Sequence, residues 1–194
     1  MAEAGTRLAL VVDPGDEVER LRRRIDELEL QVVLVLCTHG HVDHAGGAAD
    51  LVTALGVPLA MHPGDERWLQ ALPQRARIWG MPTRRVPEVD RPVAHGDTLA
   101  IGGLTARVLH TPGHTPAGCC LHFEAQGVVF TGDTLFAGSV GRTDLPTGSA
   151  ATLVQSIHTH LLALDDEVVV YPGHGPPTTI GAERRDNPFL RPGG

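Results

Sequence analysis

The stretch Thr38–Gly47 reads THGHVDHAGG and directly follows a continuous apolar run, Val32–Cys37 (VVLVLC). An apolar, β-branched run of this length is typical of a strand that is covered on both faces. Loops at strand ends often carry functional groups on a rigid scaffold. We therefore interpret this stretch as a metal-binding loop at a sheet edge. Its candidate ligands are His39, His41, Asp43 and His44.

Three more candidate ligands follow along the chain, each just beyond a predicted strand and beside glycine, proline or threonine. They are His114 in TPGHTPAG, Asp133 in FTGDTLF and His174 in YPGHG. Imidazole and carboxylate ligands suit zinc, iron or manganese. One tetrahedral ion takes about four ligands, so seven favour two ions that share a carboxylate. Two ions about 3.5–4 Å apart can hold a bridging hydroxide and clamp both the attacked oxygen and the leaving group.

Apolar patterning elsewhere alternates strands with helices. We expect helices over residues 17–30, 48–55 and 150–164, and strands over 8–12, 32–37, 58–61, 97–101, 104–110, 119–123, 128–131 and 167–171. The segment 68–92 predicts irregular structure with a helical turn or two. The tail after Pro172 is rich in proline and glycine. This order indicates an α/β fold in which sheets pack together with helices outside.

Composition narrows the functional class. The 194 residues fit one domain. The net charge of -7 argues against nucleic-acid binding, and the absence of lysine excludes Schiff-base and P-loop chemistry. No apolar run approaches the roughly 20 residues of a membrane helix. Three cysteines, two of them adjacent, make no disulfide framework, so we expect a cytoplasmic protein.

The other histidines and the cysteines have no ligand-like spacing. We expect surface or core positions for His62, His95, His110, His122, His158 and His160. We expect the three cysteines to be small core residues: Cys37, Cys119 and Cys120.

THGHVDH, with the three downstream ligands, resembles the metallo-β-lactamase-fold hydrolases. Three further segments are similar to the short bacterial type II glyoxalases, which are hydroxyacylglutathione hydrolase-like proteins: WLQALPQRARIWGM, GDTLFAGSVGRTDLP and YPGHGPPTTIGAERRDNPFL. The resemblance implies an αββα sandwich of two mixed sheets with helices outside, as a single domain over residues 1–194. Compared with the family, we expect this domain to lack the first N-terminal strands and the C-terminal helical glutathione-binding domain.

The same resemblance implies a ligand set and a reaction. One ion is held by His39, His41 and His114, the other by Asp43, His44 and His174, with Asp133 bridging the two. The implied cofactors are two divalent ions, zinc first, with iron or manganese as the other options. The implied reaction is hydrolysis of S-lactoylglutathione, or a related glutathione thioester, by a bridging hydroxide. Asp43 and Asp133 have catalytic roles in addition to metal binding.

An acidic protein needs local positive charge to bind the carboxylates of glutathione. The candidates are Arg142 in the GRTD loop, and Arg184 and Arg185 in the tail. The competing interpretation of Arg142 is an ion pair with Asp144 that shapes the loop.

Three other functions are consistent with parts of this pattern. Persulfide dioxygenases share the motif set but use one iron, bound by two histidines and one carboxylate. A lactone hydrolase shares every metal ligand and differs in its pocket. A binding module without catalysis has no need of an open two-metal site. The complete set of seven ligands favours two metals and hydrolysis, and loss of turnover with a chelator separates an enzyme from a binding module.

Overall fold

The computed structural model describes residues 1–82 and 84–191. Their contacts group the chain into two compact units, which we describe separately. The first comprises Met1–Val93 and Ala100–Leu104, and the second comprises Ala94–Leu99 and the chain from Thr105 onwards. Over the described ranges, every helix is too short or too polar to cross a membrane.

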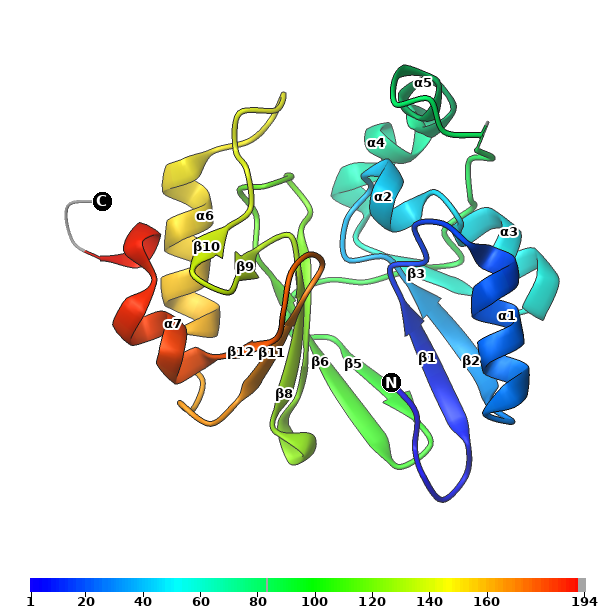
Figure 1. The fold of residues 1–194 in the computed structure, drawn as a ribbon, viewed down its shortest axis with the longest axis horizontal. Helices are drawn as coiled ribbons and strands as arrows, with labels where there is room; N and C mark the ends of the chain where they lie inside the picture. The colour runs from blue at the N-terminus through cyan, green and yellow to red at the C-terminus, as the bar shows by residue number, and fades with distance from the viewer. Residues whose placement is uncertain (83, 192–194) are drawn as a thin grey trace. The chain divides into compact units, whose positions relative to one another are not determined.

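The first unit is built on a four-stranded sheet (Figure 1) in the order β1-β2-β3-β4. Its strands are Leu8–Val12 (β1), Gln31–Leu36 (β2), Leu59–Met61 (β3) and Arg91–Pro92 (β4). The pairs β1–β2, β2–β3 and β3–β4 are all parallel. β2 is hydrogen-bonded on both sides and buried along its second half, as its uninterrupted apolar sequence predicts.

The described residues of this unit form five α-helices: Val18–Glu27 (α1), Val42–Ala45 (α2), Ala48–Leu55 (α3), Glu66–Gln70 (α4) and Leu72–Ile78 (α5). Ile25 of α1 and Leu51 of α3 share one core with Val35 of the sheet. α4 and α5 make the segment 68–92 more helical than the sequence predicted. Pro73 lies in the first turn of α5, where the missing N–H has no helical acceptor and costs nothing.

A six-stranded sheet in the order β12-β11-β8-β7-β6-β5 belongs to the second unit, apart from residues 100–104 at the turn between β5 and β6, which group with the first unit. Its strands are Thr98–Ile101 (β5), Leu104–His110 (β6), Cys119–Phe123 (β7), Val128–Gly132 (β8), Val169–Pro172 (β11) and Thr178–Thr179 (β12). β6–β7, β7–β8 and β11–β12 pair antiparallel, whereas β8–β11 is parallel. β6, β8 and β11 therefore run in one direction, and their carboxyl ends lie at the same edge of the sheet.

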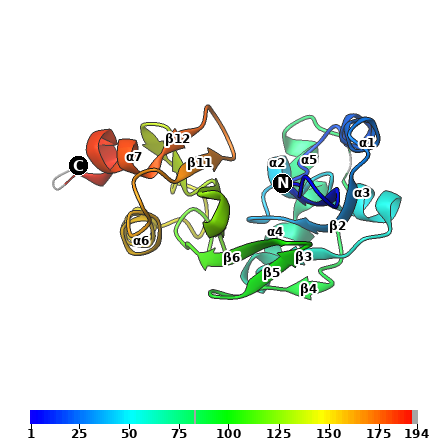
Figure 2. The ribbon, with the colours of Figure 1, turned by 90° about the horizontal axis from the view of Figure 1, so that it is seen from below.

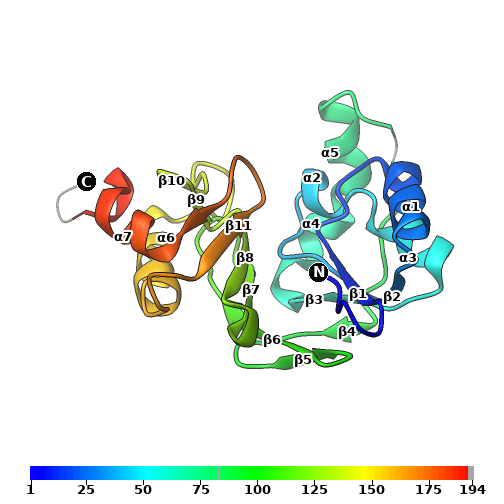
Figure 3. The same cartoon turned by 60° about the horizontal axis from the view of Figure 1, so that its bottom comes forward.

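Two helices, Ala150–Ser156 (α6) and Ile180–Asp186 (α7), lie together beside β11 and β12 (Figures 2 and 3). Leu153 of α6 and Ile180 of α7 share a core with Val129 and Val170 of the sheet. The helix predicted over 150–164 is present in two parts: α6, and a π-helix over Ile157–Leu161 that continues from it. A short hairpin, Leu135–Phe136 (β9) with Ser139–Val140 (β10), completes the unit.

The tail after Pro172, for which the sequence predicted no element, contains β12 and α7. Buried Glu183 holds this segment in place. Its carboxylate accepts hydrogen bonds from the Gly138 amide at 2.9 Å, the Thr178 hydroxyl at 2.7 Å and the Asn187 side-chain amide at 2.7 Å. These are contacts across the tertiary fold, which local sequence patterns do not reveal.

Candidate metal centre

The first unit gathers the imidazoles of the THGHVDH motif at the end of β2. The His39 ring centroid lies 4.8 Å from that of His41 and 4.1 Å from that of His44. His39 and His44 are almost wholly buried, while Asp43 is half exposed. His41 lies just before α2 and His44 within it, so one tight turn brings the three rings together.

Asp13, at the end of β1, is a site residue that the sequence analysis missed. Its Oδ1 accepts a hydrogen bond from the Thr38 amide at 2.7 Å. Its Oδ2 accepts one from the Thr38 hydroxyl at 2.7 Å and lies 2.9 Å from Nδ1 of His44. We interpret the last contact as Nδ1–H donating to the carboxylate, which leaves Nε2 of His44 available to a metal. The sequence signal that could have identified Asp13 is its place directly after a predicted strand, like the other candidate site residues.

The Asp-Pro-Gly turn after β1 packs directly on the metal-binding loop. A Cβ added to Gly15 would lie 1.7 Å from the backbone carbonyl oxygen of Asp43, and one added to Gly47 would lie 2.5 Å from that of Pro14. No side chain fits at such separations, so glycine is required at both positions. The close backbone approach holds the ligand loop against β1.

The second unit brings the other three predicted ligands to one sheet edge. His114 follows β6, Asp133 follows β8 and His174 follows β11, and the carboxyl ends of these three strands lie together. Nε2 of His114 is 3.5 Å from Oδ2 of Asp133, and Nε2 of His174 is 3.7 Å from Oδ1. One carboxylate thus faces an imidazole with each of its oxygens, which is the arrangement that a bridging ligand needs.

Arg142 forms the ion pair with Asp144 that the sequence suggested as its competing role. The two N–H···O distances are 2.8 and 2.7 Å, and this contact lowers the pKa of Asp144 to about 2. The backbone of Arg142 has a second role, because its carbonyl oxygen lies 2.7 Å from Nδ1 of His114. As with Asp13 and His44, an oxygen at Nδ1 leaves Nε2 for a metal.

The two tail arginines have different surroundings. The Arg184 guanidinium donates to the carbonyls of Leu162 at 2.7 Å and Leu164 at 2.8 Å, and it pairs with Asp166. Arg185 is exposed on the next position of α7. Arg184 therefore ties α7 to the segment after the π-helix, and its role in substrate binding stays a prediction.

The structure confirms that the cysteines are core residues, since all three are buried and none of them is in a disulfide. Burial, reinforced by nearby Asp13, raises the pKa of the Cys37 thiol. Of the histidines not assigned to the metal, His122 is buried in β7, and burial lowers its pKa. Nδ1 of His62 accepts a hydrogen bond from the Gly64 amide and caps a short turn.

The donor chemistry fits divalent transition ions. Both units offer imidazole and carboxylate groups, the set that suits zinc, iron and manganese. Within the first unit, the donor-type atoms of Asp13, His39 and His44 lie within 4.8 Å of one another, with Asp13 as the partner that orients His44. Oxygen partners at Nδ1 of His44 and His114 are typical of metal-binding histidines, which present the opposite nitrogen to the ion.

Comparison with known proteins agrees with this chemistry. The family model of the metallo-beta-lactamase superfamily matches residues 3–174. Hydroxyacylglutathione hydrolase GloC of Haemophilus influenzae is 43% identical over 184 residues, which is 94% of this chain and 87% of that protein.

Two solved structures are similar over most of their length. The BLEG-1 B3 metallo-beta-lactamase superposes with a TM-score of 0.91 at 35% identity, covering 98% of this chain and 91% of that one. TTHA1623 in a di-iron-bound form superposes with a TM-score of 0.84 at 42% identity, covering 92% and 87%. The chain therefore belongs to the metallo-β-lactamase superfamily and has its αββα fold.

Proposed function

We propose that this hydrolase uses two metal ions and is a glyoxalase II-type thioesterase, which cleaves S-lactoylglutathione or a related glutathione thioester. The observation that carries the two-metal part is the Asp133 carboxylate, whose two oxygens face His114 and His174 separately. The GloC relative, which is similar along nearly the whole chain, supports the thioester substrate.

We assign the ligands in two groups around the shared carboxylate of Asp133. The first ion takes His39, His41 and His114, and the second takes Asp43, His44 and His174. Zinc is our first choice, and the di-iron form of TTHA1623 makes iron the main alternative. Bound divalent ions of this kind act as Lewis acids and lower the pKa of water toward 7.

The side chains around the ligands set proton positions. Asp13 and the Arg142 carbonyl each hold an Nδ1 proton, on His44 and His114 respectively, so that Nε2 of both rings stays unprotonated. The half-exposed carboxylate of Asp43 can orient the attacking water as well as bind metal. The thiolate product is a good leaving group, so the reaction needs neither a nucleophilic side chain nor a strong general acid. The buried cysteines, none of them in a disulfide, fit a reducing compartment, and we propose a cytoplasmic location.

The test is steady-state hydrolysis of S-D-lactoylglutathione by protein of measured metal content. We expect turnover that follows metal content, disappears with a chelator and returns when metal is restored. Asp133→Ala and His114→Ala should lose metal and nearly all activity, whereas Asp50→Asn, at an exposed ion pair with Arg85, should keep both.

Two results would overturn parts of the proposal. Retention of both ions by Asp133→Ala, measured by elemental analysis, would refute the bridging role. Absence of turnover in wild-type protein with two ions per chain would refute the thioester substrate. Lactones and β-lactams then become the substrates to test. One iron per chain together with persulfide-dependent oxygen uptake would identify a persulfide dioxygenase instead.

A further inference from the structure

An unusual run of positive charge lies beside the ligand loop of the first unit. Residues 67–85 contain five arginines and no acidic residue, in a chain whose net charge is -7. Two of these arginines are paired, Arg84 with Asp16 at 2.5 Å and Arg85 with Asp50 at 2.7 Å. The other three arginines are carried by α4 and α5: Arg67, Arg75 and Arg77.

Trp68 connects this charge to a predicted metal ligand. The centroids of the Trp68 and His41 rings are 4.5 Å apart, in an edge-to-face contact. The guanidinium carbon of Arg75 lies over the Trp68 ring, 5.0 Å from its centroid. Trp68 is only 6% exposed. Its buried Nε1–H has no hydrogen-bond acceptor among the residues that the structure describes. Buried indole N–H groups normally have a partner, so this donor indicates a place for a ligand.

The fold fixes Trp68 relative to the histidine loop. The Gly40 amide, between His39 and His41, donates to Oδ2 of Asp65 at 3.0 Å, just before α4. A Cβ on Gly40 would lie 2.7 Å from Cβ of Trp68, so the loop and α4 are in direct contact. The indole therefore has one position with respect to His41, and it is set by backbone packing.

Arg75 is held so that its donors can bind an anion. Stacking over an indole restrains a guanidinium without using its N–H groups. Across the described ranges, no carboxylate lies within ion-pair distance of Arg75, in contrast to Arg84, Arg85, Arg142 and Arg184. A planar guanidinium with free edges matches the two oxygens of a carboxylate.

We propose that Arg75 and the Nε1–H of Trp68 form a carboxylate-binding subsite beside His41, which recognises the anionic thiol portion of the substrate. This inference rests on the proposed thioesterase function and adds a determinant of specificity to it. Arg75 binds the carboxylate through its N–H edge, and Trp68 supplies one further donor. The substrate class is thus a thioester whose thiol carries a carboxylate.

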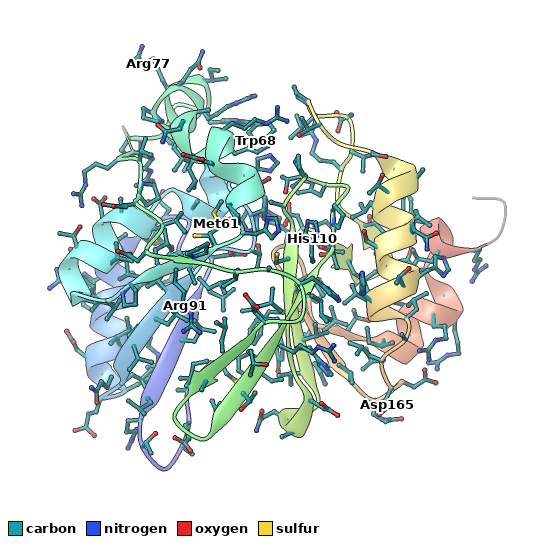
Figure 4. The ribbon with its side chains drawn as sticks, turned by 180° about the vertical axis from the view of Figure 1, so that it is seen from behind. Met61, Trp68, Arg77, Arg91, His110 and Asp165 are labelled. Atoms are coloured by element: carbon teal, nitrogen blue, oxygen red, sulfur yellow. The ribbon has the colours of Figure 1, made fainter. Side chains whose placement is uncertain are left out.

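Two thioesters with the same acyl group separate recognition from chemistry. S-D-lactoylglutathione carries two carboxylates, whereas S-lactoyl-N-acetylcysteamine carries none. For Arg75→Gln we expect KM for the first to rise about tenfold, with kcat unchanged and with KM for the second unchanged. Arg77→Gln is the matched control, because Arg77 is exposed on the same helix and lies at its outer end, away from Trp68 (Figure 4). It should change neither KM by more than about twofold.

Trp68→Phe tests the second donor, since phenylalanine keeps a ring against His41 and Arg75 but has no N–H. We expect KM for S-D-lactoylglutathione to rise about threefold, as one hydrogen bond is lost. Equal KM changes for the charged and neutral thioesters in Arg75→Gln would show that Arg75 is only structural and would overturn the subsite. Equal behaviour of the Arg75 and Arg77 variants would do the same. If Arg75→Gln does not fold, Arg75→Lys replaces it in the same comparison of the two thioesters. Lysine keeps the positive charge but lacks the planar group that stacks on Trp68.

A binding measurement separates failure of the subsite from failure of the proposed function. S-hexylglutathione is a thioether and is not hydrolysed, so calorimetry reports its affinity for the metal-loaded protein without turnover. Binding that weakens about tenfold in Arg75→Gln but not in Arg77→Gln supports the subsite, even if wild-type protein hydrolyses neither thioester. Binding that is equal in wild type and Arg75→Gln refutes the subsite, even if the enzyme is an active thioesterase.

Discussion

Asp13→Asn is the sharpest test of how the protein orients its ligands. The change keeps the size of the side chain, and the asparagine oxygen can still accept from the Thr38 amide. The group that replaces Oδ2 is an NH2, which cannot accept from Nδ1–H of His44. The imidazole must then move its proton to Nε2, the atom that we assign to the metal.

The size of the effect follows from the contact that is lost. A hydrogen bond to a charged group contributes about 1.5–3 kcal/mol, and the Asp13 side chain is only 13% exposed, so solvent screens it little. At about 1.4 kcal/mol for each factor of ten, this predicts a loss of roughly 10- to 100-fold in affinity for one ion. Losses of this order are typical when the partner of a metal-binding histidine is changed.

The assay is competition with a chromophoric chelator, which gives a dissociation constant for each ion. We expect one ion to be weakened by the predicted amount and the other to change by less than about threefold. Asp50→Asn is the control, because it removes a carboxylate from an exposed ion pair. Thermal unfolding of the metal-free proteins checks that the fold is intact. If Asp13→Asn binds both ions within twofold of wild type, Asp13 does not set the His44 tautomer.

Three further predictions concern packing, thiols and pH. Gly15→Ala should lower the free energy of unfolding by more than about 2 kcal/mol, because the new Cβ would lie 1.7 Å from the Asp43 carbonyl oxygen. Gly5→Ala, in open space, should change it by less than about 0.5 kcal/mol, and equal values in denaturant titrations would contradict the packing argument. All three thiols should resist a disulfide reagent in the native protein and react after denaturation, since all are buried; rapid labelling of native protein would contradict this. Burial lowers the pKa of His122 below 6.5, so the unfolded chain takes up a proton first and stability falls as pH drops below 6.5. His122→Gln should therefore lose less stability than wild type between pH 7 and 5.5, and an unchanged pH dependence would show that His122 is not responsible.

The strands, and the positions of the candidate ligands directly after them, could be predicted because their signals are local. The apolar run before Thr38 indicates a buried strand, and β2 lies between two neighbours. His114, Asp133 and His174 each follow a strand, and β6, β8 and β11 run in one direction. The sequence thus predicted that each of these three candidate ligands follows a strand, and the strand order of the structure places the three strand ends at one edge.

The residues that the sequence did not reveal act through contacts between distant segments. Asp13 begins the sequence Asp-Pro-Gly, which is a strong turn signal, but its hydrogen bonds reach 25 and 31 positions along the chain. Trp68 and Arg75 lie in a segment whose prolines masked two short helices. No local pattern distinguishes Glu183 in the tail, but its carboxylate accepts a hydrogen bond from an amide 45 positions away. Periodicity reports which face of an element is apolar, and it does not report which partner that face meets.

The contact between His114 and the backbone of residue 142 has a consequence for divergence within the superfamily. A carbonyl oxygen is present whatever the side chain, so this imidazole is oriented by a group that mutation of position 142 does not delete. Another residue can therefore replace Arg142 without loss of the hydrogen bond that orients the His114 imidazole. Substitutions at position 142 can therefore change substrate preference while the orientation of His114 is kept.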